Sequence, residues 1–443
     1  MRKTGKLTTA VLSVAALLAS TSGTALAASS KSAPPAAKQR GAAQTGVYPN
    51  LFTQAGYSKK NVDARVDAAW QQLFHGAPGT EPNRNDGQSV YYQLNPTMAY
   101  VEDIGNQDVR TEGMGYAMMI AVQLNHKSEF DSLWNFAKTK MQLKSGPEKY
   151  YFAWHTHTNG DIIDTGVAPD GDQWISAALT FASGRWGNGT GTYNYGNQAE
   201  KILHAMWHAS DAPGGANMFD LKTYLPVFSP PFAENYTDAS YSLPSFYKVF
   251  AAADPTDKDL WAKAYTAGEK LLQNAASPTT GLVPDYSHFD GTPYLRAGET
   301  PTDNSYTHNF QEDAWRAIAN ANIDAEWYGL KPWQTRYSNT LEKFFEKQGV
   351  NTYVSRYHLD GTPLTTGQNT YEPAHAQGLV AMNATSAISA TNKNKVDFVR
   401  DLWNTPVPSG QARYYDGLLY LLGMLYDSGK FKDWSPAVVN KKQ

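Results

Sequence analysis

Apolar residues recur at helical spacing along nearly the whole chain, and they define two alternating kinds of segment. One kind keeps its charges on one face, as in SKKNVDARVDAAWQQLF. The other is apolar on almost every side and rich in small residues, as in MGYAMMIAVQL. A helix that is apolar all round is buried. The predicted helices span residues 58–75, 111–125, 128–142, 172–185, 196–208, 241–252, 256–275, 308–327, 332–348, 377–390, 393–404 and 415–428.

This alternation repeats about six times, which predicts six helical hairpins closed into a ring. The predicted fold class is all-α, an (α/α)6 barrel with six inner and six outer helices. A linear helical solenoid is the alternative, but it would not need six wholly buried helices. No linker divides residues 46–443, so we expect one domain there. A ring can exceed the usual size of a single core because each hairpin packs mainly on its neighbours.

The N-terminus has the features of a secretory signal peptide. Arg2, Lys3 and Lys6 precede an apolar run, and an A-x-A pattern ends at Ala27. We therefore expect residues 1–27 to be a signal peptide cleaved near Ala27, with a retained membrane anchor as the alternative. Residues 28–45 are small, polar and proline-containing, which predicts a flexible leader. Together these features predict a secreted, extracellular protein.

Composition removes several functions. The chain has 0 Cys, which excludes disulfides, zinc–thiolate sites and a cysteine nucleophile. Its formal charge of -3 becomes -6 without the three basic residues of the signal, a mild balance that argues against nucleic acid or an anionic membrane surface as partner. With 12 Trp and 27 Tyr the chain is rich in aromatics, which suit both core packing and stacking on sugar rings.

Glu112 stands at the start of an uncharged predicted helix, directly after Thr111, a plausible N-cap. A first-turn glutamate is often stabilised by the helix dipole alone. The alternative is a proton donor. The helix N-terminus lowers the pKa of a carboxyl group, whereas a general acid needs it raised. Burial and a second carboxylate nearby would therefore have to dominate.

Asp313 precedes Arg316 by three residues, on the same face of a predicted helix in HNFQEDAWRAIAN. A surface ion pair of this kind contributes only a few tenths of a kcal/mol. The following residues are largely uncharged, however, which favours a buried and functional pair. Glu312 is the alternative to Asp313, and the sequence does not separate them.

Two further stretches carry polar candidates. Asp170 lies between Pro169 and Gly171, as a turn residue would. Asp172 is a plausible N-cap for the helix predicted after it. His155 and His157 have an H-x-H spacing, but no third ligand stands at helical or hairpin distance from them. We therefore expect no metal.

Several long motifs together resemble glycoside hydrolase family 8. They run in order from about residue 85 to 430: TEGMGYAMMIAV, YYFAWHTHTNGDIIDTGVAPDGDQWISAALTFASGRWG, DASYSLPSFYKVFA, HNFQEDAWRAIANANID, QGLVAMNATSAISA and RYYDGLLYLLGMLYDSG. The resemblance implies an (α/α)6 barrel that hydrolyses β-1,4-linked glycans with inversion, without a metal or organic cofactor. By position it implies that Glu112 is the general acid and Asp313 the general base. Arg316 would orient the base, and Asp170 would contact the distorted sugar.

The resemblance also implies substrate-binding residues. Trp154 matches a stacking tryptophan, Tyr241 a tyrosine near the reacting centre, and Tyr414 or Tyr415 a cleft tyrosine. In the exo-acting members a histidine- and proline-containing loop closes the cleft. This chain keeps the histidine, His375, but has Ala-Gln after it where Pro-Val is usual. Endo and exo action therefore both stay open.

The motif wording is closest to the xylan-active members of the family. The sequence thus predicts a secreted, monomeric, inverting hydrolase that cleaves β-1,4-xylosidic bonds in xylan or xylo-oligosaccharides. Alternatives within the family are a reducing-end xylose-releasing exo-oligoxylanase, a β-1,4-glucanase and a chitosanase. The alternative of another class is an inactive glycan-binding protein, which the presence of both carboxyl groups disfavours.

Overall fold

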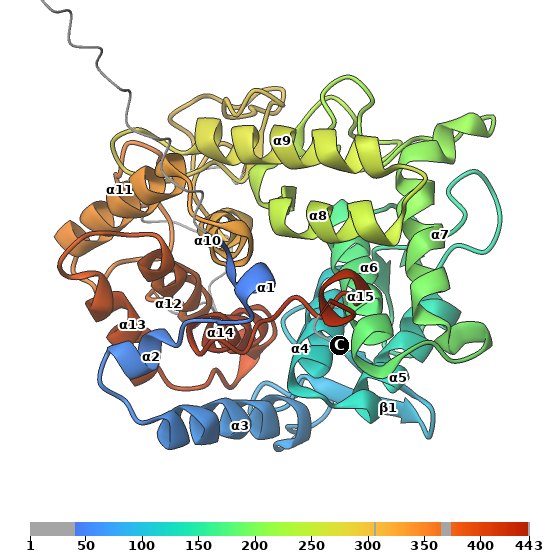
Figure 1. Ribbon diagram of the computed structural model, residues 1–443, viewed down its shortest axis with the longest axis horizontal. Helices are drawn as coiled ribbons and strands as arrows, with labels where there is room; N and C mark the ends of the chain where they lie inside the picture. The colour runs from blue at the N-terminus through green and yellow to red at the C-terminus, as the bar shows by residue number, and fades with distance from the viewer. Residues whose placement is uncertain (1–39, 305–306, 365–373, 442–443) are drawn as a thin grey trace, which may run out of the picture. The chain divides into compact units, whose positions relative to one another are not determined.

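Two concentric layers of helices surround a common axis (Figure 1). The computed structural model describes residues 40–304, 307–364 and 374–441. The predicted signal peptide at 1–27 and the leader up to residue 39 lie outside the described residues.

The inner layer is a closed ring. Its helices contact one another in chain order, and α14 returns to pack against α4. This closure confirms the predicted barrel and excludes a linear solenoid. Inner helices are buried on nearly all sides, as their uniform apolar character predicts. Their bounds are α4 Thr111–Leu124, α6 Pro169–Trp186, α8 Pro244–Ala253, α10 Arg316–Tyr328, α12 Gln377–Ala384 and α14 Tyr415–Asp427.

Each outer helix packs mainly on one inner helix. The pairs are α3 with α14, α5 with α4, α7 with α6, α9 with α8, α11 with α10 and α13 with α12. An outer helix buries mainly its apolar stripe and leaves most of its charged side chains toward solvent. Their bounds are α3 Lys59–His75, α5 Lys127–Phe136, α7 Tyr195–His208, α9 Lys258–Ala275, α11 Pro332–Gln348 and α13 Lys395–Asn404.

All twelve predicted helices are present, but three begin elsewhere than expected. The helices predicted from 172 and 241 start at Pro169 and Pro244, since proline suits the first helical position. The helix predicted from 308 starts at Arg316, after a 3₁₀ turn at Asp313–Trp315. Three short helices were not predicted: α1 Ala42–Thr45, α2 Leu51–Gln54 and α15 Pro436–Val439. The first of them lies in the expected leader, yet its alanines are buried and it packs on α10.

Short antiparallel strands brace the loops that enter the inner helices. The strand β3 (Val109–Arg110) leads directly into α4 and pairs with β4 (His155–Thr156), which pairs with β5 (Ile162–Asp164). The strand β6 (Thr237–Asp238), which precedes α8 in the chain, pairs with β7 (Tyr286–Ser287), which precedes α10. A separate hairpin joins β1 (Tyr91–Asn95) to β2 (Met98–Val101).

Glycines let α4 and α6 approach closely where the two helices begin. A Cβ atom on Gly171 would lie 2.3 Å from Thr111 Oγ1, and one on Gly115 would lie 2.7 Å from Trp174 Cβ. Side chains at these positions would push the helices apart. The glycines therefore bring the first turns of α4 and α6 together.

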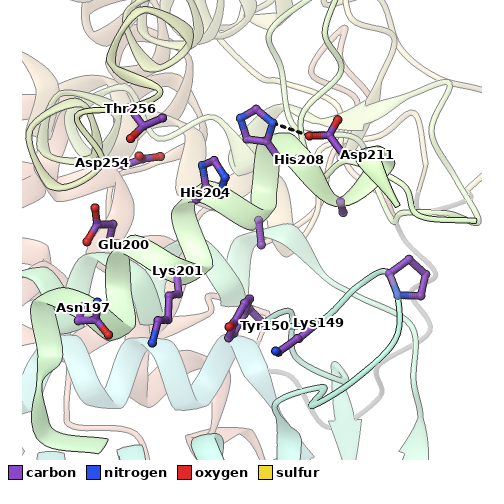
Figure 2. Close-up of a pocket in the computed structure, with 13 residues that line it drawn as sticks. Lys149, Tyr150, Asn197, Glu200, Lys201, His204, His208, Asp211, Asp254 and Thr256 are labelled. Atoms are coloured by element: carbon purple, nitrogen blue, oxygen red, sulfur yellow. Dashed lines mark hydrogen bonds and ion pairs between the residues drawn. The ribbon is translucent and has the colours of Figure 1, made fainter. Parts of the chain in front are cut away.

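A cavity of about 730 Å³ lies on the outer layer beside α7 (Figure 2). Of the helices in the described ranges, none has the length and apolar character that a membrane crossing requires.

Candidate active site

The loops that enter four inner helices meet around one cavity of about 410 Å³. The segments that lead into α4, α6, α8 and α10 therefore gather at one end of the ring. The cavity is lined by Arg110, Thr111, Glu112, Trp154, Val167, Ala168, Asp170, Phe228, Ser229, Tyr241, Tyr286 and Asp313.

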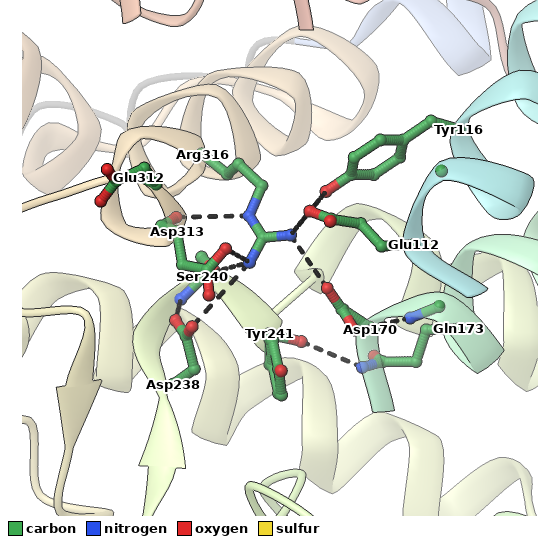
Figure 3. Close-up of polar contacts among 12 residues, drawn as sticks. Glu112, Tyr116, Asp170, Gln173, Asp238, Ser240, Tyr241, Glu312, Asp313 and Arg316 are labelled. Carbon is green, nitrogen blue, oxygen red and sulfur yellow. Dashed lines mark hydrogen bonds and ion pairs between the residues drawn. The ribbon is translucent and has the colours of Figure 1, made fainter. Parts of the chain in front are cut away.

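Arg316, the first residue of α10, connects the acidic groups of this cavity (Figure 3). Its Nη1 lies 2.7 Å from Glu112 Oε1 and 2.9 Å from Asp170 Oδ2. Its Nη2 lies 2.9 Å from Asp313 Oδ1 and donates to Ser240 Oγ at 2.8 Å. The guanidinium side chain is only 5% exposed. One planar group therefore holds carboxyl groups from the starts of α4 and α6 and from the turn before α10 in a fixed arrangement.

Burial raises the pKa of Glu112 to about 8. Arg316 opposes that rise, while the charges of Asp170 and Asp313 add to it. The helix N-terminus does not prevent the increase, because withdrawal from water is the largest effect on this side chain. A carboxyl group with this pKa keeps its proton at neutral pH and can donate it.

The structure distinguishes Asp313 from Glu312. Asp313 lines the cavity and is 34% exposed on its side chain. Glu312 points away from the guanidinium of Arg316 in Figure 3 and pairs with Arg356. The predicted pair at i and i+3 is therefore present, and it involves Asp313.

Asp170 and Asp172 both occupy positions other than those that their local sequence predicts. Asp170 is not in a turn but in the first turn of α6, where it is buried against Arg316. Burial raises its pKa. The prediction that Asp172 caps this helix is wrong, because Ala168 is the N-cap. Asp172 is fully buried within α6, and its Oδ1 accepts a hydrogen bond from the Phe152 N–H at 3.2 Å.

Three polar residues at the site were not predicted from the sequence. Tyr116 stands one turn after Glu112 and donates to its Oε1 at 3.2 Å. Ser240 accepts from Arg316, and Asp238 is fully buried with its Oδ2 3.8 Å from Arg316 Nη2. The i+4 spacing of Tyr116 was a usable signal. Asp238 and Ser240 stand in the motif DASYSLPSFYKVFA, but only the fold brings their loop to α10.

Two of the expected sugar-binding aromatics line the cavity. Trp154 directly precedes β4 in the chain. Its carbonyl oxygen accepts a hydrogen bond from the Thr111 N–H at 3.0 Å, which ties the residue to the start of α4. Tyr241 lies parallel to Phe228, with ring centroids 5.8 Å apart and an interplanar angle of 6°. Both rings are thus held by neighbouring structure beside Glu112 and Asp313.

Tyr414 and Tyr415 lie behind the acidic residues and do not line the cavity. The Tyr414 hydroxyl accepts from the Gly113 N–H at 3.1 Å, which supports the turn that carries Glu112. The Tyr415 hydroxyl donates to the Glu312 carbonyl at 2.8 Å, next to Asp313. In this arrangement both tyrosines position the site from outside it.

His375 is also directed away from the cavity. Its Nδ1 lies 2.8 Å from the Tyr353 carbonyl, and its Nε2 lies 3.3 Å from Asp401 Oδ2 on the outer helix α13. The loop that precedes it, residues 365–373, lies outside the described residues. Of the H-x-H pair, His155 binds Asp108 Oδ2 at 2.7 Å through Nε2 and belongs to no candidate metal cluster in the described ranges.

The arrangement can perform acid–base chemistry. A carboxyl group protonated at neutral pH and a second, arginine-paired carboxyl group face one cavity with aromatic walls. A pair of carboxyl groups of this kind can protonate a leaving oxygen and accept a proton from an attacking water.

Comparison with known proteins identifies the family. Residues 98–429 match the model for Glycosyl hydrolases family 8. A reducing-end xylose-releasing exo-oligoxylanase of Paenibacillus barcinonensis is 40% identical over 89% of this chain and 98% of its own. A structure of that protein with an arabinofuranosyl-xylotetraose superposes with a TM-score of 0.82, 39% identity, and coverage of 90% of this chain and 99% of the other. A family 8 xylobiose complex from Teredinibacter turnerae gives a TM-score of 0.81 at 40% identity, covering 89% and 100%.

Proposed function

Because the chain belongs to glycosyl hydrolase family 8, we propose that it cleaves β-1,4-xylosidic bonds in xylan or xylo-oligosaccharides with inversion at the anomeric carbon. The observation that carries this proposal is the convergence of Glu112, Asp170 and Asp313 on Arg316 inside one cavity. The xylan-type substrate is inferred from relatives that are 36–40% identical and act as exo-oligoxylanases.

In the proposed mechanism Glu112 donates its proton to the glycosidic oxygen as the bond breaks. Asp313 accepts a proton from the water that attacks the anomeric carbon from the opposite face. Inverting enzymes hold these two carboxyl groups ~6.5–9.5 Å apart, which leaves room for that water. Glu112 and Asp313 bind different nitrogens of the Arg316 guanidinium, at 2.7 and 2.9 Å. A separation of this size between the two carboxyl groups is compatible with that arrangement.

Arg316 and Asp170 would prepare the site for the transition state. Arg316 orients Asp313 through the 2.9 Å ion pair. Asp170 places a carboxyl group where a sugar ring distorted toward an oxocarbenium ion would lie, and its charge helps to raise the pKa of Glu112. Trp154 and Tyr241 supply flat faces for the sugar chain.

Two modes of action are supported by different observations. The signal-like N-terminus favours a polymer outside the cell and hence internal cleavage. The exo-oligoxylanase relatives favour release of single xylose units from the reducing end. The Ala-Gln pair after His375 departs from the motif of the exo-acting members, so we place internal cleavage first.

Product analysis tests the proposal and separates these modes. Purified protein and its Glu112→Gln variant are incubated with xylan, xylotetraose, carboxymethylcellulose and chitosan, and the products are resolved by chromatography. We expect a ladder of xylo-oligosaccharides from xylan, with the variant inactive. Release of xylose alone would support the exo mode. Cleavage of carboxymethylcellulose or chitosan but not of xylan would contradict the substrate assignment.

Secretion and the monomeric state form part of the proposal. They are supported by the signal-peptide pattern that ends at Ala27 and by the closed ring of a single chain. N-terminal sequencing of protein recovered from culture medium should begin at Ala28, and light scattering should give the mass of one chain. Retention in the cytoplasm would contradict the first expectation, and a dimer the second.

A further inference from the structure

Two histidines on the outer helix α7 share an aspartate at the start of α9, and none of the three lines the catalytic cavity. His204 and His208 are one turn apart, and their rings stack with centroids 4.2 Å apart. His204 Nδ1 lies 2.7 Å from Asp257 Oδ2, and His208 Nε2 lies 2.9 Å from Asp257 Oδ1. Ligand atoms from all three residues lie within 4.8 Å of one another.

A fourth residue, which carries a second carboxyl group, lies beside this cluster with one oxygen that has no hydrogen-bond partner among the described residues. Asp254 ends α8 and is fully buried. Its Oδ2 accepts from Trp261 Nε1 at 3.1 Å, whereas its Oδ1 has no hydrogen-bond partner among the described residues. A buried carboxylate oxygen without a partner is costly, and a cation is one group that can satisfy it.

The second nitrogen of each imidazole is also placed as metal binding requires. A histidine that binds a metal through one nitrogen usually donates the other N–H to a carboxylate, a carbonyl or water. His208 Nδ1 lies 3.1 Å from Asp211 Oδ2, which can accept that proton (Figure 2). His204 is 49% exposed on its side chain, so its Nε2–H can be hydrated.

The spacing of the ligand atoms fits a small cation after a minor adjustment. With bonds of about 2.0–2.1 Å, the ligands of a tetrahedral zinc ion lie about 3.3 Å apart. The present N···O distances of 2.7 and 2.9 Å would widen by roughly half an ångström, which side-chain rotation can supply. His208 faces a carboxylate oxygen at each ring nitrogen, so a cation that binds through Nε2 displaces one proton, which solvent takes up.

We propose that His204, His208 and Asp257, assisted by Asp254, form a binding site for a divalent cation of the zinc class. Imidazole nitrogens suit zinc, whereas calcium and magnesium prefer sites made of oxygen ligands. The adjoining cavity of about 730 Å³ gives an ion access from solvent. Since α7 and the α8–α9 turn supply the ligands, the bound ion would clamp two hairpins of the ring together. None of these residues lines the catalytic cavity, so hydrolysis would not depend on the ion.

The sequence does not reveal this site, because the fold assembles it. His204 and His208 have the i, i+4 spacing of helical metal ligands. The aspartate that completes the set follows almost 50 residues later, at the start of another helix. Only the packing of α7 near α9 brings it to the histidines.

Zinc binding to the tag-free, chelator-treated full chain tests the proposal. Equilibrium dialysis with zinc chloride should show one ion per chain, and zinc should raise the melting temperature, because a ligand of the folded state stabilises it. His204→Gln/His208→Gln should abolish both effects. Asp211→Asn should weaken binding by roughly 10–100-fold, as for loss of a carboxylate behind a ligating histidine.

His75→Gln is the matched control, because it removes another surface histidine paired with a carboxylate, Glu129 at 3.3 Å. It should bind zinc like the wild type. Absence of zinc binding by the wild-type chain would overturn the proposal, as would undiminished binding by the double variant. If the double variant does not fold, His204→Gln alone decides, since this side chain is half exposed. Hydrolysis is not the readout, so failure of this proposal would be distinct from failure of the proposed function.

Discussion

Acidic groups are buried at both ends of helix α10, but only the groups at its first residue are paired with a cation. At its first residue, Arg316 contacts Glu112, Asp170 and Asp313. Near its last residue, Glu326 lies close to Asp427 of α14. No hydrogen-bond partner reaches either of these two carboxyl groups within the described ranges.

Burial raises the pKa of carboxyl groups at both ends, but a cation opposes that rise only at the end that carries Glu112. The pKa of Glu326 is raised well above its ordinary value by burial and by Asp427. Burial likewise raises the pKa of Glu112, but Arg316 opposes it and the result is about 8. A neighbouring cation therefore limits the rise in the pKa of a buried acid, so that Glu112 can gain and lose a proton near neutral pH.

The largest expected effect follows from neutralising the proposed acid or base. Glu112→Gln and Asp313→Asn should each reduce hydrolysis of xylan by about 10²–10⁴-fold, the usual contribution of a general acid or base. Melting temperatures should change little, because both substitutions keep the shape of the side chain. Glu312→Gln is the matched control next to Asp313 and should keep most of the activity. Loss of activity in Glu312→Gln with retention in Asp313→Asn would reverse the assignment.

Replacing Arg316 should make the carboxyl groups at the two ends of α10 alike, because neither end would then have a neighbouring cation. Arg316→Met leaves three acidic groups around an uncompensated site, and breaking a buried pair of this kind costs about 3–5 kcal/mol. Without Arg316 the carboxyl groups hold their protons more tightly, so the loss should grow as pH rises from 5 to 8. Urea denaturation at several pH values measures this. An unchanged free energy of unfolding across that range would show that Arg316 does not carry the electrostatic balance of the site.

The opposite end can be tested by a neutral replacement. Because the pKa of Glu326 is raised, the folded protein binds this proton more tightly than the unfolded chain does. Wild-type stability should therefore fall as pH rises above the unfolded value of about 4.3, by up to ~1.4 kcal/mol per pH unit for this group. Glu326→Gln should lose that part of the pH dependence and leave hydrolysis unchanged. Urea denaturation at pH 5 and pH 7 compares the variants, and identical pH dependence would contradict the account.

The smallest expected effect is a displacement of the pH profile. Since Glu112 must carry its proton, kcat/KM should fall above pH about 8. The charge of Asp170 contributes to that pKa after burial and Arg316, so Asp170→Asn should move the alkaline limb to lower pH, by roughly one unit. The position of the limb is the readout, because the substitution also weakens contact with substrate. A limb that moved to higher pH would contradict the assigned electrostatics.

The sequence was most informative where local pattern and packing agree. Uniformly apolar segments such as that of α14 predicted the inner helices, and charge on one face predicted outer helices such as α9. Helix starts were less predictable. Asp172 has the chemistry of an N-cap, but Pro169 begins the helix earlier and carries Asp172 into the core.

The site was predictable only in part. The motifs that resemble family 8 drew attention to Glu112, Asp170, Asp313 and Arg316, which the fold brings together. They gave no reason to expect that a single guanidinium would contact all three carboxyl groups. Asp238 stands in the motif DASYSLPSFYKVFA, but its contact with Arg316, 78 residues further along the chain, depends on the fold.

The central claim is that Glu112 and Asp313 act on opposite faces of one glycosidic bond. Proton NMR of xylotetraose hydrolysis, recorded before the products mutarotate, tests it most directly. The account predicts that the newly formed reducing end appears first as the α-anomer, because water attacks the face opposite the leaving group. Initial formation of the β-anomer would mean retention and would contradict it.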